Sequence, residues 1–493
     1  MLRLPLPPWK TGWRQKAALS LFELFLLTAF CLITNAAPAA ETKADYQLLA
    51  AFDLPAHLLK ATATITLAPG AATVVRLDGL RVTAVELDGV EVKAGGPTLT
   101  IAASAAERRL IIHYRKEVSS MADGLIEKAG IDLSDNWYPQ LDFPALFHLQ
   151  AIIPANFLAV SEADSISTEA VPNSRLVTFK FSRPLTYLHF VAGPYVKREV
   201  AFGGGKSLYT YFFPEDAELA ADYLRKGKAY IRRYEKLIGP YPYQRFSIVE
   251  NRLPTGYAMP TFTLLGQAVV RLPFIVDTSL GHEILHSWFG NAIGVDYSQG
   301  NWCEGLTTYL ADQSFAAERG QGALFRKGQL IKFAAVNREL GGTIEEFKGG
   351  EASPNPRRIA RRAVGYGKAS MLFHMLRRKV GDRVFFAALR DFYRRMDGKT
   401  ASWRDIEQSF KNAGGSGLQS FFKQWLTQKD VPDLKAEDIS LKEANGRLRL
   451  KFTIAQSNKV PYKIEVPVVI TNDFGQRRET VNLTSKSKKV ELT

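Results

Sequence analysis

Residues 282–291 read His-Glu-Ile-Leu-His-Ser-Trp-Phe-Gly-Asn, and the first five match the pattern H-E-x-x-H. Positions i and i+4 of an α-helix lie on one face, so the imidazoles of His282 and His286 can bind one Zn²⁺ from the same side. Glu283 lies beside them, where its carboxylate can take a proton from water at the metal. The motif lies among the apolar residues Leu280, Ile284, Leu285, Trp288 and Phe289. The stretch predicts a buried helix that carries a catalytic zinc site, with one ion per chain.

A third protein ligand is needed, because a catalytic zinc site uses three protein ligands and a water molecule. The best candidate is Glu304, which lies 18 positions after His286 at the start of a predicted helix that runs to Tyr309. If this helix is antiparallel to the first, it returns the carboxylate to the metal. An acid in the first turn of a helix is favoured in any case, so Glu304 can instead be a helix cap.

Three other residues near the motif are weaker ligand candidates. Asp296 lies too early in the connecting loop, and Asp312 lies two helical turns beyond Glu304. Cys303 can bind zinc as a thiolate, but adjacent helical positions point about 100° apart, so it points away from the direction of Glu304. We interpret Cys303 as a small packing residue.

Length and composition favour a folded protein of several domains. The chain has 493 residues, which at about 150 residues per domain predicts roughly three domains. Hydrophobic residues make up 46% and charged residues 23%, which excludes wholesale disorder. The sequence has no repeat of fixed length, which excludes solenoids.

Three kinds of pattern follow one another along the chain. From Tyr46 to about Val200, short stretches rich in Val, Ile, Leu and Thr alternate with Gly and Pro turns, which is typical of a β-sandwich. Residues 215–238 have helical apolar spacing, and helical patterns dominate from Gly266 to Gln428. Strand patterns return beyond Pro432. The predicted fold class is α+β and multidomain, with an N-terminal β-sandwich at residues 45–203, a mostly helical domain at 205–432 and a small β-sandwich at 433–493.

The first 39 residues have the composition of an export signal. Four basic residues precede an apolar stretch from Ala17 to Ile33, and Ala37-Pro38-Ala39 offers a cleavage site. The alternative is a membrane anchor over residues 17–37, since the apolar stretch approaches spanning length, although Glu23 inside it disfavours a stable span. We expect residues 1–39 to be a signal peptide and the protein to be periplasmic or extracellular. Membrane contact is expected only through this segment, if it stays uncleaved.

The charge balance is basic, with 64 Lys and Arg against 49 Asp and Glu, a formal net charge of +15. Because the basic residues are scattered, we interpret the charge as a solvated surface and expect no nucleic-acid partner. The chain has two cysteines, and Cys31 lies within the expected signal peptide. Cys303 would then be left without a partner for an intrachain disulfide.

The motif region as a whole resembles a known family. After His286 the chain continues Ser287-Trp288-Phe289-Gly290-Asn291, and it then reads Trp302-x-Glu304-Gly305. These segments are similar to the alanyl aminopeptidase and leukotriene hydrolase family, which are gluzincin zinc metallopeptidases. Comparable segments are Tyr241-Pro242-Tyr243, Tyr366-Gly367-Lys368 and Trp403 to Pro432, so the similarity covers about residues 45–432. The resemblance implies an N-terminal β-sandwich, a thermolysin-like catalytic domain and a short β-sandwich after it.

The resemblance also implies roles for single residues. His282 and His286 would bind zinc, Glu283 would be the general base, and Glu304 would be the third ligand. The family reads Trp-x-Asn-Glu-Gly where this chain reads Trp-Cys-Glu-Gly at 302–305, so one residue is deleted before the glutamate. Tyr366 matches the family's catalytic tyrosine, in Tyr-Gly-Lys rather than Tyr-Glu-Lys, and would donate a hydrogen bond to the oxyanion.

Two departures from the family bear on specificity. Family aminopeptidases carry Gly-x-Met-Glu-Asn, whose Glu holds the free α-amine of the substrate. Here the substrate-binding stretch is Gly256, Tyr257, Ala258 and Met259, followed by Pro260 in place of that Glu. Proline carries no charge and donates no backbone hydrogen bond, so the amine anchor is missing unless Glu250 or another acid substitutes. The stretch can still take substrate backbone as an added strand. The chain also reaches Thr493 without the family's large helical domain, and both departures predict a more open site.

We therefore expect a zinc-dependent metallopeptidase that acts on a peptide or protein, aminopeptidase-like but without the usual amine-anchoring Glu. Two alternatives stay open. One is a catalytically inactive family fold that serves as a protein-binding module, and the other is a zinc hydrolase of a non-peptide substrate. The intact set of two histidines, Glu283, Glu304 and Tyr366 disfavours the first, because a binding module needs none of them.

Overall fold

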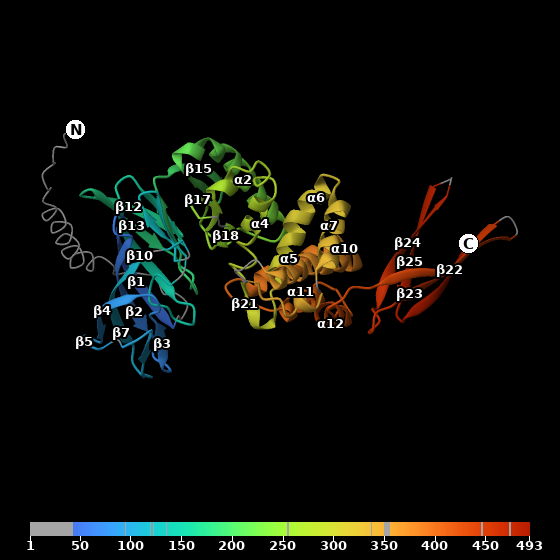
Figure 1. The fold of residues 1–493 in the computed structure, drawn as a ribbon, viewed down its shortest axis with the longest axis horizontal. Coiled ribbons are helices and arrows are strands. Elements are labelled where there is room, and N and C mark those ends of the chain that lie inside the picture. The colour runs from blue at the N-terminus through green and yellow to red at the C-terminus, as the bar shows by residue number, and fades with distance from the viewer. Residues whose placement is uncertain are drawn as a thin grey trace, which may run out of the picture.

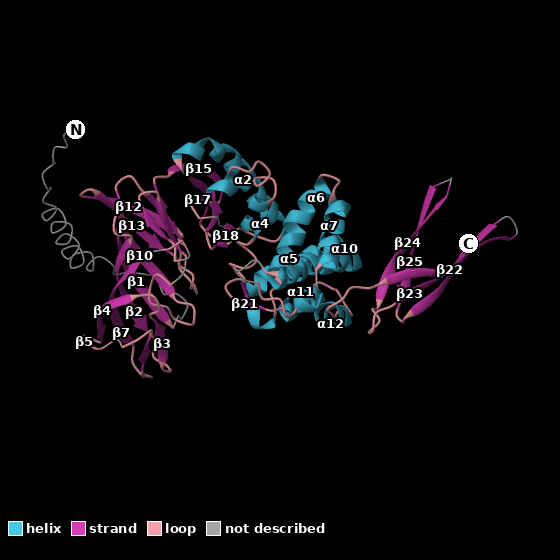
Figure 2. Ribbon diagram, viewed as in Figure 1, coloured by secondary structure: helices cyan, strands magenta, loops and turns pink. Residues whose placement is uncertain are grey.

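A computed structural model of the chain describes residues 43–493, apart from residues 94, 119, 122, 135, 254–255, 337, 350–354, 445–446 and 473–474. The expected signal peptide at 1–39 and the alternative anchor at 17–37 lie outside these residues. In the described part of the chain, no helix has the length and apolar character needed to cross a membrane. The chain runs from a β-rich region through a mainly helical region to a second β region (Figures 1 and 2). This predicted order is confirmed.

The N-terminal region packs two β-sheets against each other and contains a further two-stranded sheet, β3-β6. The larger sheet has the strand order β12-β13-β10-β1-β2-β7-β4-β5, and the smaller has the order β11-β14-β9-β8. Phe190 of the smaller sheet stacks on Phe52 of the larger one, with ring centroids 5.2 Å apart. The strands are β1 (Ala44–Asp53), β2 (Leu58–Leu67), β3 (Thr73–Arg76), β4 (Arg81–Leu87), β5 (Val90–Glu91), β6 (Thr98–Ile101), β7 (Arg108–Glu117), β8 (Leu125–Glu127), β9 (Gly130–Leu133), β10 (Leu146–Pro154), β11 (Leu158–Ser161), β12 (Ser165–Val171), β13 (Ser174–Lys180) and β14 (Phe190–Gly193).

A five-stranded sheet opens the middle region, with the strand order β15-β16-β17-β19-β18. Its strands are β15 (Val196–Gly203), β16 (Lys206–Phe212), β17 (Arg245–Asn251), β18 (Gly256–Met259) and β19 (Phe262–Gly266). Because β15 pairs with β16, this sheet begins inside the range 45–203 that the sequence assigns to the N-terminal sandwich. Strand patterning alone gives no information about which sheet a strand joins.

Helices follow this sheet and form most of the middle region. They are η1 (Pro214–Leu219), α2 (Ala220–Leu237), α3 (Gln267–Val270), α4 (Ser279–Leu285), η2 (Tyr297–Gln299), α5 (Cys303–Thr308), η3 (Tyr309–Gln313), α6 (Ser314–Glu318), α7 (Gly322–Ala335), α8 (Arg338–Gly341), α9 (Pro356–Arg362), η4 (Ala363–Lys368), α10 (Ala369–Met396), α11 (Trp403–Asn412) and α12 (Gln419–Thr427). Two short strands, β20 (Gly294–Val295) and β21 (Thr400–Ala401), pair in parallel. The segments η3 and η4 are π-helical turns that continue into α6 and α10.

The two faces of the five-stranded sheet contact different parts of the molecule. Consecutive residues of a strand point to opposite faces. Ile248 of β17 faces Gly227 of α2, whereas Val249 joins a buried cluster with Val160 and Val191 of the N-terminal region. Met259 of β18 belongs to the same cluster. The N-terminal region therefore packs on the sheet face opposite α2, and it reaches β18.

The C-terminal region forms a three-stranded sheet, β22-β23-β26, and a two-stranded sheet, β24-β25. The strands are β22 (Leu434–Ala444), β23 (Arg447–Gln456), β24 (Ile464–Asn472), β25 (Gly475–Leu483) and β26 (Ser487–Leu492). Phe452, Ile454, Val481 and Leu483 form a small core between the sheets. Tyr462 is fully buried and lies against Trp425 of α12, with ring centroids 5.1 Å apart, which joins this region to the helical one.

Candidate metal centre and active site

The helix α4 presents the two histidines of the motif on one face. The helix ends at Leu285, but His286 keeps helical dihedral angles, φ −58° and ψ −19°. The i, i+4 spacing is therefore preserved, and the rings of His282 and His286 lie 4.9 Å apart between centroids. Gly281 lets α4 approach α6 closely, since a Cβ there would lie 2.5 Å from the Phe315 ring of α6.

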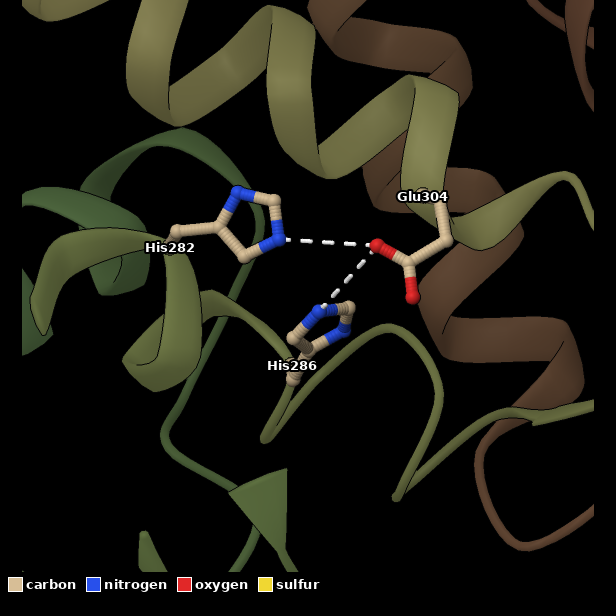
Figure 3. Close-up of side chains that lie close together, drawn as sticks. All are labelled: His282, His286 and Glu304. Carbon is tan, nitrogen blue, oxygen red and sulfur yellow. Dashed lines mark ion pairs between the residues drawn. The ribbon is translucent and has the colours of Figure 1, made fainter. Parts of the chain in front are cut away.

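Glu304 comes from α5 and faces both imidazoles (Figure 3). Its Oε2 atom lies 3.5 Å from Nε2 of His282 and 3.7 Å from Nε2 of His286. Ligand atoms of the three residues all lie within 4.8 Å of one another. Two imidazole nitrogens and one carboxylate oxygen that converge on one point are the donor set of a catalytic zinc site. These three residues could therefore hold a metal ion.

The first backbone N–H groups of α5 are bound by a residue other than Glu304. The Oδ1 atom of Asn301 accepts hydrogen bonds from the backbone N–H groups of Cys303, at 2.9 Å, and Glu304, at 3.4 Å. Gly305 lets α5 approach α10 closely, since a Cβ there would lie 2.4 Å from the Cβ of Ala369. Asn301 thus accepts hydrogen bonds from the first two backbone N–H groups of α5, and the side chain of the N-cap residue Trp302 makes no capping hydrogen bond.

The Nδ1 atoms of both histidines are engaged on the side away from Glu304. His282 Nδ1 lies 2.7 Å from Oδ2 of Asp312, and His286 Nδ1 lies 3.0 Å from the carbonyl oxygen of Phe289. Such partners fix the ring orientation and the tautomer that leaves Nε2 available for a metal. Asp312, weighed from the sequence as a weak ligand candidate, contacts the nitrogen of His282 that faces away from the metal position.

The position of Asp312 depends on a π-helical turn. In a straight α-helix, eight residues after Glu304 correspond to a rotation of roughly 80° around the axis. Asp312 lies within η3, and the i→i+5 bonds of a π-helix accommodate an extra residue in the turn. This turn packs against α4. The sequence carries no signal for the π turn, and for this reason sequence reasoning missed the role of Asp312.

Asp312→Asn is expected to weaken zinc binding by about 10–100-fold, because it removes the charge that orients His282 while keeping the size of the side chain. Competition with a chromophoric chelator measures the change in affinity. Asp296→Asn is the matched control, since the Asp296 carboxylate accepts hydrogen bonds from Ser298 and Gln299 in its own loop. An unchanged affinity in Asp312→Asn would show that the contact with His282 does not support the metal site.

Cys303 lies on the Nδ1 side of His286, whereas Glu304 lies on the Nε2 side. Its Sγ atom donates a hydrogen bond to the carbonyl oxygen of Phe289 at 2.9 Å and lies 3.3 Å from Nδ1 of His286. Burial raises the pKa of the Cys303 thiol well above its usual value. A buried, protonated thiol on the Nδ1 side is a packing group and does not converge with the Nε2 atoms.

Burial and the neighbouring histidines together set the pKa values of Glu304 and Glu283. Burial raises the pKa of the Glu304 carboxyl, but the hydrogen bond with His282 and the charges of both imidazoles outweigh it and bring the pKa to about 2. Glu304 is therefore ionised and ready to bind a cation. Burial also raises the pKa of Glu283, and the nearby histidines only partly oppose this. A raised pKa suits a general base that works near neutral pH.

Tyr366 lies at the same site, on the π-helical turn η4. Its hydroxyl lies close to the Glu304 carboxylate, and its ring lies 6.0 Å from the ring of Phe347 between centroids. Burial, followed by the charge of Glu304, raises the pKa of Tyr366 above its ordinary value. The phenol therefore stays protonated and can donate a hydrogen bond.

The predicted substrate-binding stretch, residues 256–259, forms β18 at the edge of the five-stranded sheet. It pairs with β19 in antiparallel orientation and packs against α4. The side chain of Met259 is buried, whereas Tyr257 is 53% exposed. An edge strand offers its outer backbone groups to an extended peptide.

Glu250, the acid considered as a substitute amine anchor, is fully buried in β17. Its Oε2 atom accepts a hydrogen bond from the backbone N–H of Phe213 at 2.8 Å. Burial raises the pKa of Glu250 to about 8. At neutral pH this carboxyl is mostly neutral, so it lacks the charge and exposure that a substrate amine requires.

The part of the chain that forms this site is similar in sequence to known peptidases. Residues 275–425 match the sequence model described as Peptidase family M1 domain. The chain is 26% identical to Aminopeptidase N of Lactococcus lactis subsp. lactis over 164 residues, which are 32% of this chain and 19% of that protein. It is 25% identical to Aminopeptidase O of Homo sapiens over 230 residues, 40% of this chain and 28% of that protein.

A longer match is to Aminopeptidase M1 of Arabidopsis thaliana, 23% identical over 381 residues, which are 72% of this chain and 42% of that protein. The chain spans less than half of the length of each of these relatives. The matched segment 275–425 contains His282, Glu283, His286, Glu304 and Tyr366.

Proposed function

The chain resembles the alanyl aminopeptidase family of gluzincin peptidases, whose M1 domain it matches over residues 275–425, and from this premise we propose that it is a zinc-dependent metallopeptidase. The observation that supports the proposal is that ligand atoms of His282, His286 and Glu304 all lie within 4.8 Å of one another. Glu283 lies on α4 together with His282, and Tyr366 lies on η4. A peptide or protein is the proposed substrate.

His282, His286 and Glu304 would hold the zinc ion. When bound, zinc lowers the pKa of water and polarises the substrate carbonyl. Glu283 takes the proton of the attacking water and then passes it to the leaving amine. The Tyr366 hydroxyl donates a hydrogen bond to the oxygen of the scissile carbonyl as negative charge develops there. Asp312 and the Phe289 carbonyl hold the two imidazole rings in place.

Among the described residues at β18 and immediately after it, the substrate N-terminus would meet no family-type anchor. Pro260 carries no carboxylate, and Glu250 is buried against Phe213. A free amine and a blocked amine are therefore expected to bind with similar affinity. We propose an aminopeptidase-like peptidase that does not require a free N-terminus.

This proposal predicts comparable cleavage of one peptide with and without an N-terminal acetyl group. A charge-assisted hydrogen bond to the amine is worth about 1.5–3 kcal/mol, or roughly one to two powers of ten in selectivity, and its absence removes that preference. Mass spectrometry of the products gives both rates and the cleavage positions.

Each outcome of the acetylation experiment is informative. If only the free peptide is cut, the chain is a strict aminopeptidase, and an acid elsewhere in the site holds the amine. If neither peptide is cut by zinc-loaded protein, the peptidase function fails. The two alternatives, a protein-binding module and a hydrolase of a non-peptide substrate, then take its place.

A further inference from the structure

A strongly basic helix leads directly into the π turn that carries Tyr366. The helix α9 reads Pro-Arg-Arg-Ile-Ala-Arg-Arg over residues 356–362 and contains no acid. Its last residue, Arg362, is exposed, and its guanidinium carbon lies 4.4 Å from the centroid of the Tyr366 ring. A guanidinium at this distance makes a cation–π contact. One exposed cation is thus fixed beside the proposed oxyanion donor.

No carboxylate among the described residues pairs with Arg362, whereas Arg377 pairs with Asp382 and Arg271 with Asp216. Arginine stays charged at any physiological pH and carries five N–H donors in a fork that fits a carboxylate. The contact with the Tyr366 ring holds the guanidinium in place without an anionic partner. Within the described part of the chain, Arg362 is therefore a positioned cation without a carboxylate partner, next to the candidate metal centre.

We propose that Arg362 binds a carboxylate of the peptide substrate and thereby selects anionic peptides. The inference rests on the proposed peptidase function. Tyr366 lies close to Glu304, and the Arg362 guanidinium lies over the Tyr366 ring. At a rise of about 3.3 Å per residue, a carboxylate bound here belongs to a residue within about two positions of the scissile bond.

Two sources can supply such a carboxylate: the C-terminus of a short peptide or the side chain of Asp or Glu. Four tripeptides separate them. Ala-Ala-Gln amide is neutral at this end, Ala-Ala-Gln with a free C-terminus carries the terminal carboxylate, Ala-Ala-Glu amide carries the side-chain carboxylate, and Ala-Ala-Glu with a free C-terminus carries both.

Wild-type protein is expected to hydrolyse at least one carboxylate-bearing tripeptide with a kcat/KM about 10- to 100-fold above that of the neutral amide, mainly through a lower KM. Arg362→Gln should bring this preference to within about twofold. Arg362→Lys should restore part of it, because lysine keeps the charge but not the planar fork. Arg357→Gln, at another exposed arginine of α9, is the matched control and should leave the preference unchanged.

Direct binding separates this inference from the peptidase proposal. The same four tripeptides are titrated calorimetrically into zinc-loaded Glu283→Gln and into the double variant Glu283→Gln, Arg362→Gln. Tighter binding of carboxylate-bearing tripeptides that disappears in the double variant supports the role of Arg362, even if wild-type protein cleaves no peptide. Hydrolysis without a preference for carboxylates would leave the peptidase in place and overturn this role. An equal fall of kcat on neutral and anionic tripeptides in Arg362→Gln would also overturn it, because Arg362 would then act through the Tyr366 ring.

Discussion

Glu283→Gln is expected to keep the metal ion and to lose nearly all peptide turnover. Glutamine has the size of glutamate but cannot accept a proton at neutral pH, and loss of a general base costs about 10²–10⁴-fold in rate. Glu283 is not among the three residues whose ligand atoms converge, so zinc occupancy should not change. Steady-state kinetics on one unblocked peptide, together with metal analysis of the same sample, measures both quantities.

The matched control for this variant is Glu218→Gln, at an exposed glutamate of η1. It changes the net charge by the same amount and should turn over peptide at the wild-type rate. Wild-type turnover by Glu283→Gln would mean that another group takes the proton from water. The proposed role of Glu283 would then be wrong.

Glu304→Ala is expected to abolish stable zinc binding. Removing a ligand should cost more than the roughly 100-fold that loss of a supporting partner costs. The remaining two imidazoles make an incomplete donor set for a catalytic zinc site. Zinc content after dialysis, measured by mass spectrometry of the metal, gives the result without reference to activity.

Cys303→Ser is the neighbouring control, because Sγ of Cys303 lies on the Nδ1 side of His286 at 3.3 Å. Serine is close to isosteric and can donate the same hydrogen bond to the Phe289 carbonyl. Zinc content should stay at one ion per chain. Full occupancy in Glu304→Ala together with loss in Cys303→Ser would identify Cys303 as the third ligand.

The local part of the site was predictable, because the spacing of His282 and His286 alone fixes both rings on one helical face. Glu304 was proposed from its distance along the chain and from a family resemblance, and it lies 3.5 Å from His282 in the folded chain. Asp312 was not recognised as the partner of His282, since its position depends on a π-helical turn that cannot be predicted from the sequence pattern. Long-range partners of this kind become visible only once the helices are packed.

The order of the regions was also predictable, because alternating and helical apolar spacing differ clearly along the chain. The sheet membership of β15 was not, because the pairing of Val196 with Phe212 is a contact between strands and not a property of either one. In the same way, the sequence does not distinguish Arg362 from the other three arginines of α9. Only the turn into η4 brings it over the ring of Tyr366.

The central claim is that residues His282, His286 and Glu304 hold a zinc ion on which peptide hydrolysis depends. The most direct test is to remove metal from wild-type protein with a chelator, dialyse the chelator away, and measure hydrolysis of an unblocked peptide while zinc is added back. We expect no detectable hydrolysis by the metal-free protein and full recovery at one equivalent of zinc per chain. Hydrolysis at an undiminished rate by protein shown to be free of metal would contradict it.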